Sequence, residues 1–173
     1  VGTNVGATVE AGEPDHLGSG STHSIWYVLT PSIDGRATVD TVGSNFDTIL
    51  AAYTGTSVDA LTLVAGNDDD GGSTSRVTFR VAAGTPYYLA VEGYGDATGE
   101  VTLNHQVAVL QPPPNDNFSS AQVLVGTAGQ AIGTNVDAGA EALEPNHAGF
   151  DPQASVWYRW TAATTTAAVL DTF

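Results

Sequence analysis

The feature that most constrains the fold is an internal repeat, in which the numbers of matching positions differ by 131. Residues 2–5 read GTNV, and residues 133–136 read GTNV again. The match runs on without a gap, so that residues 1–42 and 132–173 share 18 identical positions out of 42. A period of this length exceeds the roughly 20–50 residues of a solenoid unit and is the size of a whole domain. The sequence therefore predicts one domain-sized unit followed by part of a second copy.

A proline-rich segment separates the two copies. Residues 111–114 read QPPP, which favours a stiff polyproline II spacer. We therefore expect a first unit at 1–110, a linker at 111–114 and the N-terminal half of the next unit at 115–173. The second unit opens with NDNFSSAQVLVGTAGQAI at 115–132, a segment that has no copy in the first unit. The first unit thus lacks an opening strand, and the second lacks its later half.

Short β-branched runs broken by Gly, Asp, Asn and Pro predict an all-β chain. In one run Val77, Phe79 and Val81 alternate with polar side chains, as in a strand with one buried face. The spacing of the runs favours a two-sheet β-sandwich of jelly-roll or Greek-key type. We expect strands in the first unit at 23–30, 35–42, 48–54, 60–65, 76–82, 86–93 and 99–108, and in the second at 121–125, 133–137, 154–161 and 167–172.

Charge and composition exclude several classes of protein. With 19 acidic and 4 basic residues the net charge is −15, which repels the phosphates of nucleic acids and anionic lipids. The absence of Cys excludes disulfides, thiol nucleophiles and thiolate metal sites. No apolar stretch reaches the roughly 18 residues that a membrane span needs. Residue 1 is Val rather than Met, so we expect a processed or partial chain that is secreted or on the cell surface.

Three clusters of carboxylates and amides are candidate calcium sites. One is Glu10 with Glu13 and its copy at the matching positions of the repeat, the second opens the second unit, and the third is the NDDDGG run. Ca²⁺ takes about 6–8 oxygen ligands, which such loops can supply. Solvated turns are the alternative, because Asp, Asn and Gly favour turns in any case. The candidate ligands are Asn115, Asp116, Glu141, Glu144, Glu10, Glu13, Asp68 and Asp69.

Other recurring side chains favour structural roles. His16 and His147 stand at matching positions, and no second His has zinc-ligand spacing, so hydrogen bonding within the loop is favoured. Trp26 and Trp157 also recur, and core packing is favoured over sugar stacking. The chain has no G-x-S-x-G, no H-E-x-x-H and no phosphate-binding loop. We therefore expect no enzymatic activity.

The order of motifs resembles that of bacterial pre-peptidase C-terminal-like (PPC) domains. The motifs are NDNFSSAQVL, E-x-x-EPxH, S-[IV]-WY, SNFDTILAAYTG, NDDDGG, AGTPYYLAVEGY and GEVTL, and they span essentially the whole chain in permuted order. The resemblance implies a non-catalytic, calcium-binding β-sandwich, secreted or on the cell surface, beside a protease or in tandem copies. Related collagen-binding modules hold calcium near their N-terminal segment, which implies Asn115, Asp116, Glu141 and Glu144 here. On this resemblance the Glu10 and Glu13 site is incomplete unless another segment supplies the missing ligands, because the first unit lacks the NDN segment.

We therefore expect a calcium-stabilised structural repeat of an extracellular bacterial fibre or surface array. Its incomplete units would be completed by self-association, in which a neighbouring subunit donates a strand, or by the next repeat of a longer chain. A carbohydrate- or matrix-binding adhesion module is one alternative, with Tyr94 as its exposed aromatic residue. An accessory domain of a secreted peptidase is the other.

Overall fold

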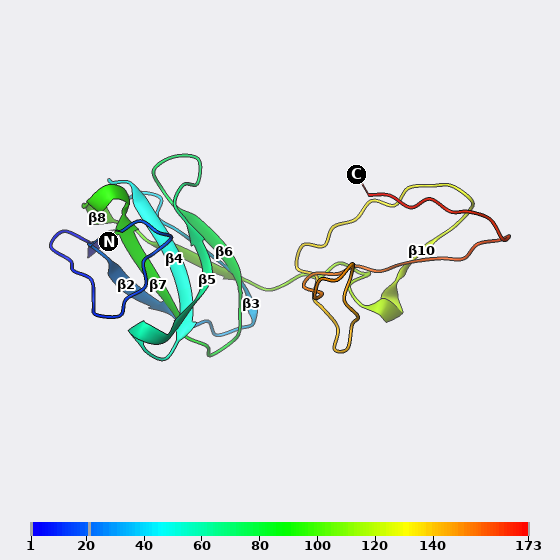
Figure 1. Ribbon diagram of the computed structural model, residues 1–173, viewed down its shortest axis with the longest axis horizontal. Helices are drawn as coiled ribbons and strands as arrows, with labels where there is room; N and C mark the ends of the chain where they lie inside the picture. The colour runs from blue at the N-terminus through cyan, green and yellow to red at the C-terminus, as the bar shows by residue number, and fades with distance from the viewer. Residues whose placement is uncertain (1, 21, 173) are drawn as a thin grey trace. The chain divides into compact units, whose positions relative to one another are not determined.

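The computed structural model describes residues 2–20 and 22–172 and divides the chain into two compact units, Val1–Val109 and Leu110–Phe173. The prediction of an all-β fold is confirmed, because regular structure in the described residues consists of strands and three single-turn 3-10 helices (Figure 1). Among those residues no helix has the length and apolar character that crossing a membrane requires. The 3-10 helices are η1 (Val58–Ala60), η2 (Tyr94–Asp96) and η3 (Phe118–Ser120).

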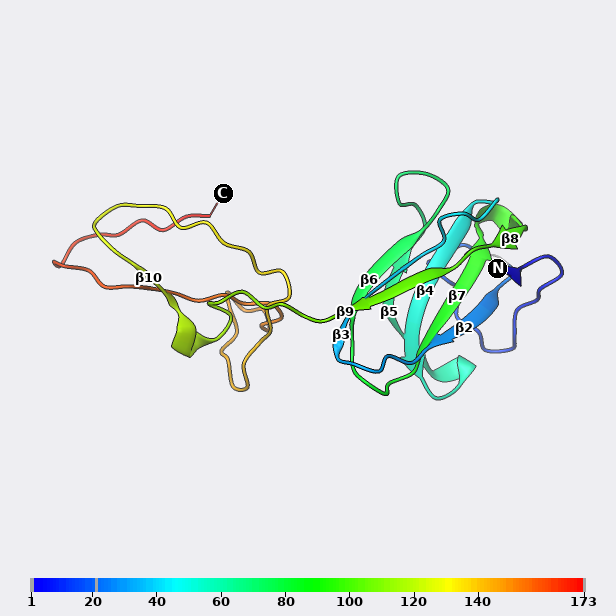
Figure 2. The same cartoon turned by 180° about the vertical axis from the view of Figure 1, so that it is seen from behind.

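Unit 1 is a sandwich of two antiparallel sheets, seen from both sides in Figures 1 and 2. The first sheet has the order β2-β7-β4-β5, and the second has the order β6-β3-β9. A separate short pair joins β1 to β8. The bounds are β1 (Gly2–Thr3), β2 (Ile25–Leu29), β3 (Gly35–Asp40), β4 (Thr48–Gly55), β5 (Leu61–Asn67), β6 (Arg76–Val81), β7 (Tyr87–Gly93), β8 (Glu100–Val101) and β9 (Asn104–Ala108).

The core between the two sheets follows from the period-two alternation of the strands. In β6 the side chains of Val77, Phe79 and Val81 are buried while the intervening ones are exposed, as the sequence predicts. β3 alternates in the same way and is paired with β6 along its whole length. The buried cluster takes side chains from both sheets and from β8, namely Ala37, Val39, Leu50, Ala52, Val77, Phe79, Val81, Tyr87, Leu89, Val91 and Val101.

The outer face of the first sheet is also covered, by the loop between β1 and β2. Ala51, Tyr53 and Ala90 form a second buried cluster on that face, and Trp26 packs against it. His16, in the middle of the loop, is only 2% exposed. Central strands buried on both faces lose the polar alternation, which explains why β4 and β7 are buried almost throughout.

Unit 2 contains little regular structure. Its strands are β10 (Gln122–Leu124) and β11 (Tyr158–Trp160), which pair in parallel. Only Asn115 and Ala138 are buried among its described residues. The strands expected at 133–137 and 167–172 are not formed. A strand needs a paired neighbour, and unit 2 holds no segment that matches the partners of β1 and β3 in unit 1.

Individual contacts nevertheless recur at matching positions of the repeat. The side-chain amide of Asn4 donates to the carbonyl of His23 at 3.2 Å. The amide of Asn135 donates to the carbonyl of Ala154, also at 3.2 Å. At these positions the two copies make the same contact, although the strands around it differ.

Candidate metal centre

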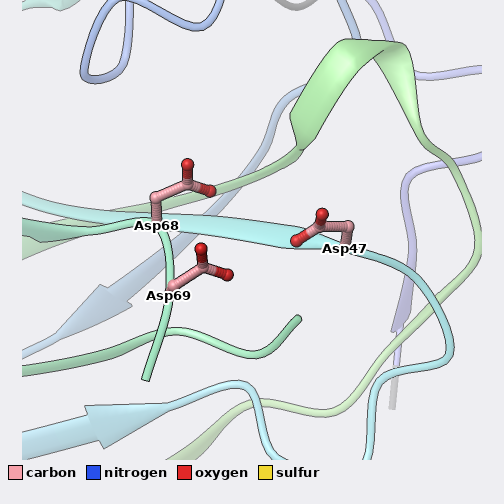
Figure 3. Close-up of side chains that lie close together, drawn as sticks. All are labelled: Asp47, Asp68 and Asp69. Atoms are coloured by element: carbon pink, nitrogen blue, oxygen red, sulfur yellow. The ribbon is translucent and has the colours of Figure 1, made fainter. Parts of the chain in front are cut away.

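Three aspartates meet at one end of the first sheet. Asp47 immediately precedes β4, while Asp68 and Asp69 immediately follow β5. β4 and β5 are antiparallel, and Leu50 lies opposite Asn67, so the start of one strand adjoins the end of the other. Figure 3 shows the three carboxylates gathered there.

The spacing of these carboxylates suits a single cation. One oxygen from each of Asp47, Asp68 and Asp69 lies within 4.8 Å of the other two. Two oxygens bound to one Ca²⁺ at about 2.3–2.6 Å can be at most about 5 Å apart. In the described part of the chain this is the one group of three or more acidic or histidine side chains that converges in this way.

Two oxygens of the cluster are buried without a partner. Oδ1 of Asp47 and Oδ1 of Asp68 are inaccessible to solvent and accept no hydrogen bond. A buried acceptor that makes no bond costs about 1–3 kcal/mol, and more when it is charged. Burial raises the pKa of Asp68, and the charges of Asp69 and Asp47 raise it further. A bound cation would remove both costs, so the residues present fit a metal ion.

Buried hydroxyl groups hold the two loops that carry the cluster. Thr41, Thr48 and Ser75 are fully buried. The backbone N–H of Ser75 donates to the Thr41 hydroxyl at 2.8 Å, and the Ser75 hydroxyl lies 2.6 Å from the carbonyl oxygen of Asp68. Asp47 is anchored separately, because its carbonyl accepts from the N–H of Tyr94 at 3.0 Å. The carboxylates are therefore positioned by the fold and not by one another.

The neighbouring Asp70 does not belong to the cluster. Its Oδ2 accepts a hydrogen bond from Nε of Arg76 at 2.6 Å. The guanidinium group of Arg76 therefore pairs with Asp70, whereas the described residues place no such ion pair on Asp47, Asp68 or Asp69.

Sequence reasoning selected Asp68 and Asp69 but missed Asp47. The signal for Asp47 was its place directly before a strand, in the run SNFDTILAAY. Antiparallel pairing brings the residue before one strand to the residue after the next. That rule could have added Asp47 to the set.

The other predicted calcium ligands of unit 1 lie in a network of protein donors. Oε1 of Glu13 accepts from Nε2 of His16 at 3.1 Å, from Nε1 of Trp26 at 3.2 Å and from the Ser24 hydroxyl. Oε2 of Glu13 accepts from the N–H of Glu10 at 2.7 Å. Burial acts to raise the pKa of Glu13, but the hydrogen bonds from Ser24, the backbone of Glu10 and His16, with the charge interaction with His16, outweigh it and lower the pKa. The structure thus gives Glu13 a loop-closing role, and its binding of calcium stays a prediction from sequence.

A second buried carboxylate lies under the same loop. Glu92 on β7 is 1% exposed, and its carboxylate accepts from the hydroxyl of Ser19. Burial raises the pKa of Glu92 to about 7, and the nearby charges of Asp15, Glu13 and Asp96 act in the same direction. No sequence pattern marked this residue, because β7 reads as an ordinary buried strand.

In unit 2 the predicted calcium ligands contact backbone donors. Oε2 of Glu141 accepts from the N–H of Phe118 at 2.7 Å, and Oδ1 of Asp116 accepts from that of Gly139 at 2.6 Å. Oε2 of Glu144 accepts from the N–H of Glu141 at 2.8 Å, as Glu13 does from Glu10 in unit 1. These side chains do not form a converging group of three. Calcium binding at this set therefore stays a prediction from sequence.

Asn115, the remaining predicted ligand, contacts the backbone of Trp157. The side-chain amide of Asn115 donates to the backbone carbonyl of Trp157 at 3.0 Å. The backbone carbonyl of Asn115 accepts from the backbone N–H of Trp157 at 2.8 Å. Asn115 thereby ties the opening segment of unit 2 to the segment leading into β11.

The copied network of unit 2 is incomplete. Oε1 of Glu144 and Nε1 of Trp157 are buried but make no hydrogen bond, although the matching atoms of Glu13 and Trp26 bond to each other. His147 lies with Nε2 3.3 Å from Glu144 Oε1, and its side chain is 47% exposed.

Comparisons with known proteins return no relative. No family model, no curated protein and no solved structure matches the chain. The resemblance to PPC domains therefore rests on the motifs alone.

Proposed function

We propose that this chain is a non-catalytic structural module of an extracellular bacterial fibre or surface array, stabilised by calcium bound at Asp47, Asp68 and Asp69. The observation that carries the proposal is the pair of buried, unpartnered oxygens in this cluster. A cation bound there would join the loop before β4 to the loop after β5. It would therefore stabilise the sheet without taking part in a reaction.

The ligand chemistry favours calcium over softer metals. The cluster offers carboxylate oxygens, and the chain has no Cys to supply thiolates. Hard oxygen ligands suit Ca²⁺ and Mg²⁺, and irregular geometry suits Ca²⁺ better because Mg²⁺ requires near-octahedral coordination. A net charge of −15 adds a general attraction for cations.

Features of both units support a role in assembly. The same contacts recur at matching positions of the repeat, as in an array of equivalent units. Unit 2 exposes large apolar side chains that an isolated domain would bury. They include Val125, Ile132, Phe150, Val169 and Leu170.

Calcium titration of the full chain by calorimetry tests the metal assignment. Asp47→Asn and Asp69→Asn should each weaken calcium binding about tenfold or more, because each removes a charged ligand. Asp151→Asn is the matched control, since it removes the same charge from an exposed site in unit 2. A Mg²⁺ titration at equal ionic strength separates a specific site from general charge screening.

Two results would contradict the assignment. If all three variants weakened binding equally, the ions would be held by net charge and not by a site. If Glu141→Gln abolished binding while Asp47→Asn did not, calcium would bind in unit 2, where the motif resemblance places it.

A hollow in unit 1 favours the adhesion module as a second candidate. Its volume is about 230 Å³, and the rings of Trp26 and Tyr88 line it together with Glu10 and Ser57. Ligand pockets combine aromatic side chains with a few polar groups, and this lining could take a sugar ring against its aromatic faces. Retention of the full chain on polysaccharide columns, lost in Tyr88→Ala, would support this function, and no retention on a broad panel would exclude it.

A further inference from the structure

At one edge of the first sheet in unit 1, the described residues include no neighbouring strand. β2 lies at the end of the order β2-β7-β4-β5, and β7 is its one partner among the described residues. Every residue of β2 is apolar or aromatic, yet none is fully buried and Val28 is 60% exposed. An exposed apolar edge of this kind can accept a further strand.

The ladder shows which backbone groups of β2 point outward. In the β4–β7 ladder Thr48 lies opposite Gly93, so the next pair along is Asp47 and Tyr94. The N–H of Tyr94 bonds to the carbonyl of Asp47, which makes this a hydrogen-bonded pair. Along an antiparallel ladder, hydrogen-bonded pairs alternate with pairs that are not hydrogen-bonded. The backbone groups of Ala90 on β7 therefore bond to β4 and point away from β2. Trp26 lies opposite Ala90, so its backbone groups do not bond to β7. The N–H and carbonyl groups of Trp26 and Val28 therefore face the open edge.

In unit 2 the corresponding groups are occupied. Trp157 matches Trp26 in the repeat, and its N–H donates to the carbonyl of Asn115. Its carbonyl accepts from the N–H of Gln122 at 3.0 Å and from the side chain of Asn115 at 3.0 Å. The segment that opens unit 2 thus covers the same edge that is bare in unit 1.

We propose that the outer edge of β2 is a docking site for residues 115–124 of a second copy of this chain. The register follows from β10 and β11, in which Gln122, Val123 and Leu124 lie opposite Tyr158, Arg159 and Trp160. By the match between the two copies of the repeat, these three residues lie opposite Tyr27, Val28 and Leu29. The added strand runs parallel to β2, and Asn115 bonds to the backbone of Trp26.

The exchange extends the pairing of the donated segment. In unit 2, β10 pairs over three residues with a strand that has no further sheet beside it. β2 offers five residues and is already part of a four-stranded sheet with a buried core. Strands are more stable in larger sheets that have a packed face. The donated segment therefore gains hydrogen bonds and burial on moving to β2.

Charge does not oppose the contact, although the chain is strongly acidic. Residues 117–136 and 24–33 contain no charged side chain. Asp116 is the one charged residue of the donated segment 115–124, so two copies with a net charge of −15 can approach through strands that carry little charge.

The contact is heterologous, because each copy has one donor segment and one acceptor edge. Contacts of this kind produce open chains unless the rotation closes into a ring. The inference rests on the assembly role proposed above but does not require calcium, so the two can fail separately.

Disulfide cross-linking between two single-cysteine variants tests the register. The chain has no Cys, and the side chains of Val28 and Val123 are both exposed, so Val28→Cys and Val123→Cys leave the core intact. The two variants are mixed at micromolar concentration and oxidised in chelator. Paired strands hold the thiols at millimolar effective concentration, so heterodimers should form about 100-fold faster than by random encounter. Val28→Cys mixed with Val169→Cys, an exposed residue outside the segment, gives the random rate.

Each other outcome overturns the proposal. Cross-linking at the rate of the Val169→Cys control shows that no strand is donated. Dimers of Val28→Cys alone show that two β2 edges pair with each other. A cross-linked monomer of the double variant carrying both cysteines, with no dimer, shows that the segment docks within its own chain.

Discussion

The ring of His16 and the phenol of Tyr53, which are 37 residues apart in the chain, share a 2.7 Å hydrogen bond. Nε2 of His16 faces the carboxylate of Glu13, which can only accept, so Nε2 carries the proton and Nδ1 accepts from Tyr53. Burial lowers the pKa of His16 and raises that of Tyr53 to about 12, so both side chains are neutral at pH 7. This bond fastens the loop between β1 and β2 to the outer face of the sheet.

Tyr53→Phe should therefore destabilise unit 1 by about 1–3 kcal/mol, because it leaves the buried Nδ1 of His16 without a donor. Urea unfolding followed by Trp fluorescence measures the loss. Tyr94→Phe is the matched control, since Tyr94 is 58% exposed, and it should change stability by less than about 0.5 kcal/mol. Equal effects of the two variants would show that the loop is not held by this bond.

Glu92 should make stability depend on pH. Its pKa of about 7 in the folded state lies above the value of 4.5 for an unperturbed group. The folded state therefore binds the proton more tightly, and the stability from this group is complete below pH 4.5 and lost as pH rises through 7. The loss is at most about 3–4 kcal/mol, since each pKa unit corresponds to about 1.4 kcal/mol.

Glu92→Gln keeps an acceptor for Ser19 but cannot ionise. Relative to this variant, the wild type should lose stability between pH 4.5 and 8 in chemical unfolding experiments. Subtracting the two stability–pH curves cancels the titration of distant groups. The charges that act on Glu92 itself come from Asp15, Glu13 and Asp96, and Tyr53 interacts with the same site. Parallel curves would contradict the assignment.

Asp68→Asn should change the melting temperature in opposite directions with and without calcium. In chelator it removes a charge that burial and two neighbouring carboxylates disfavour, so Tm should rise by a few degrees. In calcium the variant should lose most of the increment that ligand binding provides, which is about 2.7 kcal/mol at 100 times Kd. Differential scanning calorimetry in both conditions measures the crossover. A loss of Tm in chelator would mean that Asp68 is structural without a metal.

Glu13→Gln should destabilise the chain equally in calcium and in chelator. The Glu13 carboxylate accepts from His16, Trp26 and the backbone of Glu10, and an amide nitrogen cannot accept in its place. The cost should be about 1–3 kcal/mol. A loss confined to calcium would instead support the sequence prediction that Glu13 is a calcium ligand.

The sequence predicts those features that depend on local pattern. Val77, Phe79 and Val81 are buried because a period of two requires it once the run is a strand. Segments 133–137 and 167–172 are also expected to be strands from their local pattern, but they form none. Strand formation also depends on partners elsewhere in the chain. Asp47 was missed for the same reason, since its approach to Asp68 follows from the pairing of β4 with β5.

Val39 and Leu170 occupy matched positions of the repeat, yet the first is fully buried and the second is 79% exposed. Val39→Ala should cost about 2 kcal/mol, because it leaves a cavity between the sheets. Leu170→Ala should change the stability of the monomer by less than about 0.5 kcal/mol. Urea unfolding at low protein concentration compares the two variants. An equal cost would show that unit 2 packs this segment in solution, and a cost for Leu170→Ala that grows with protein concentration would show that a neighbouring copy covers it.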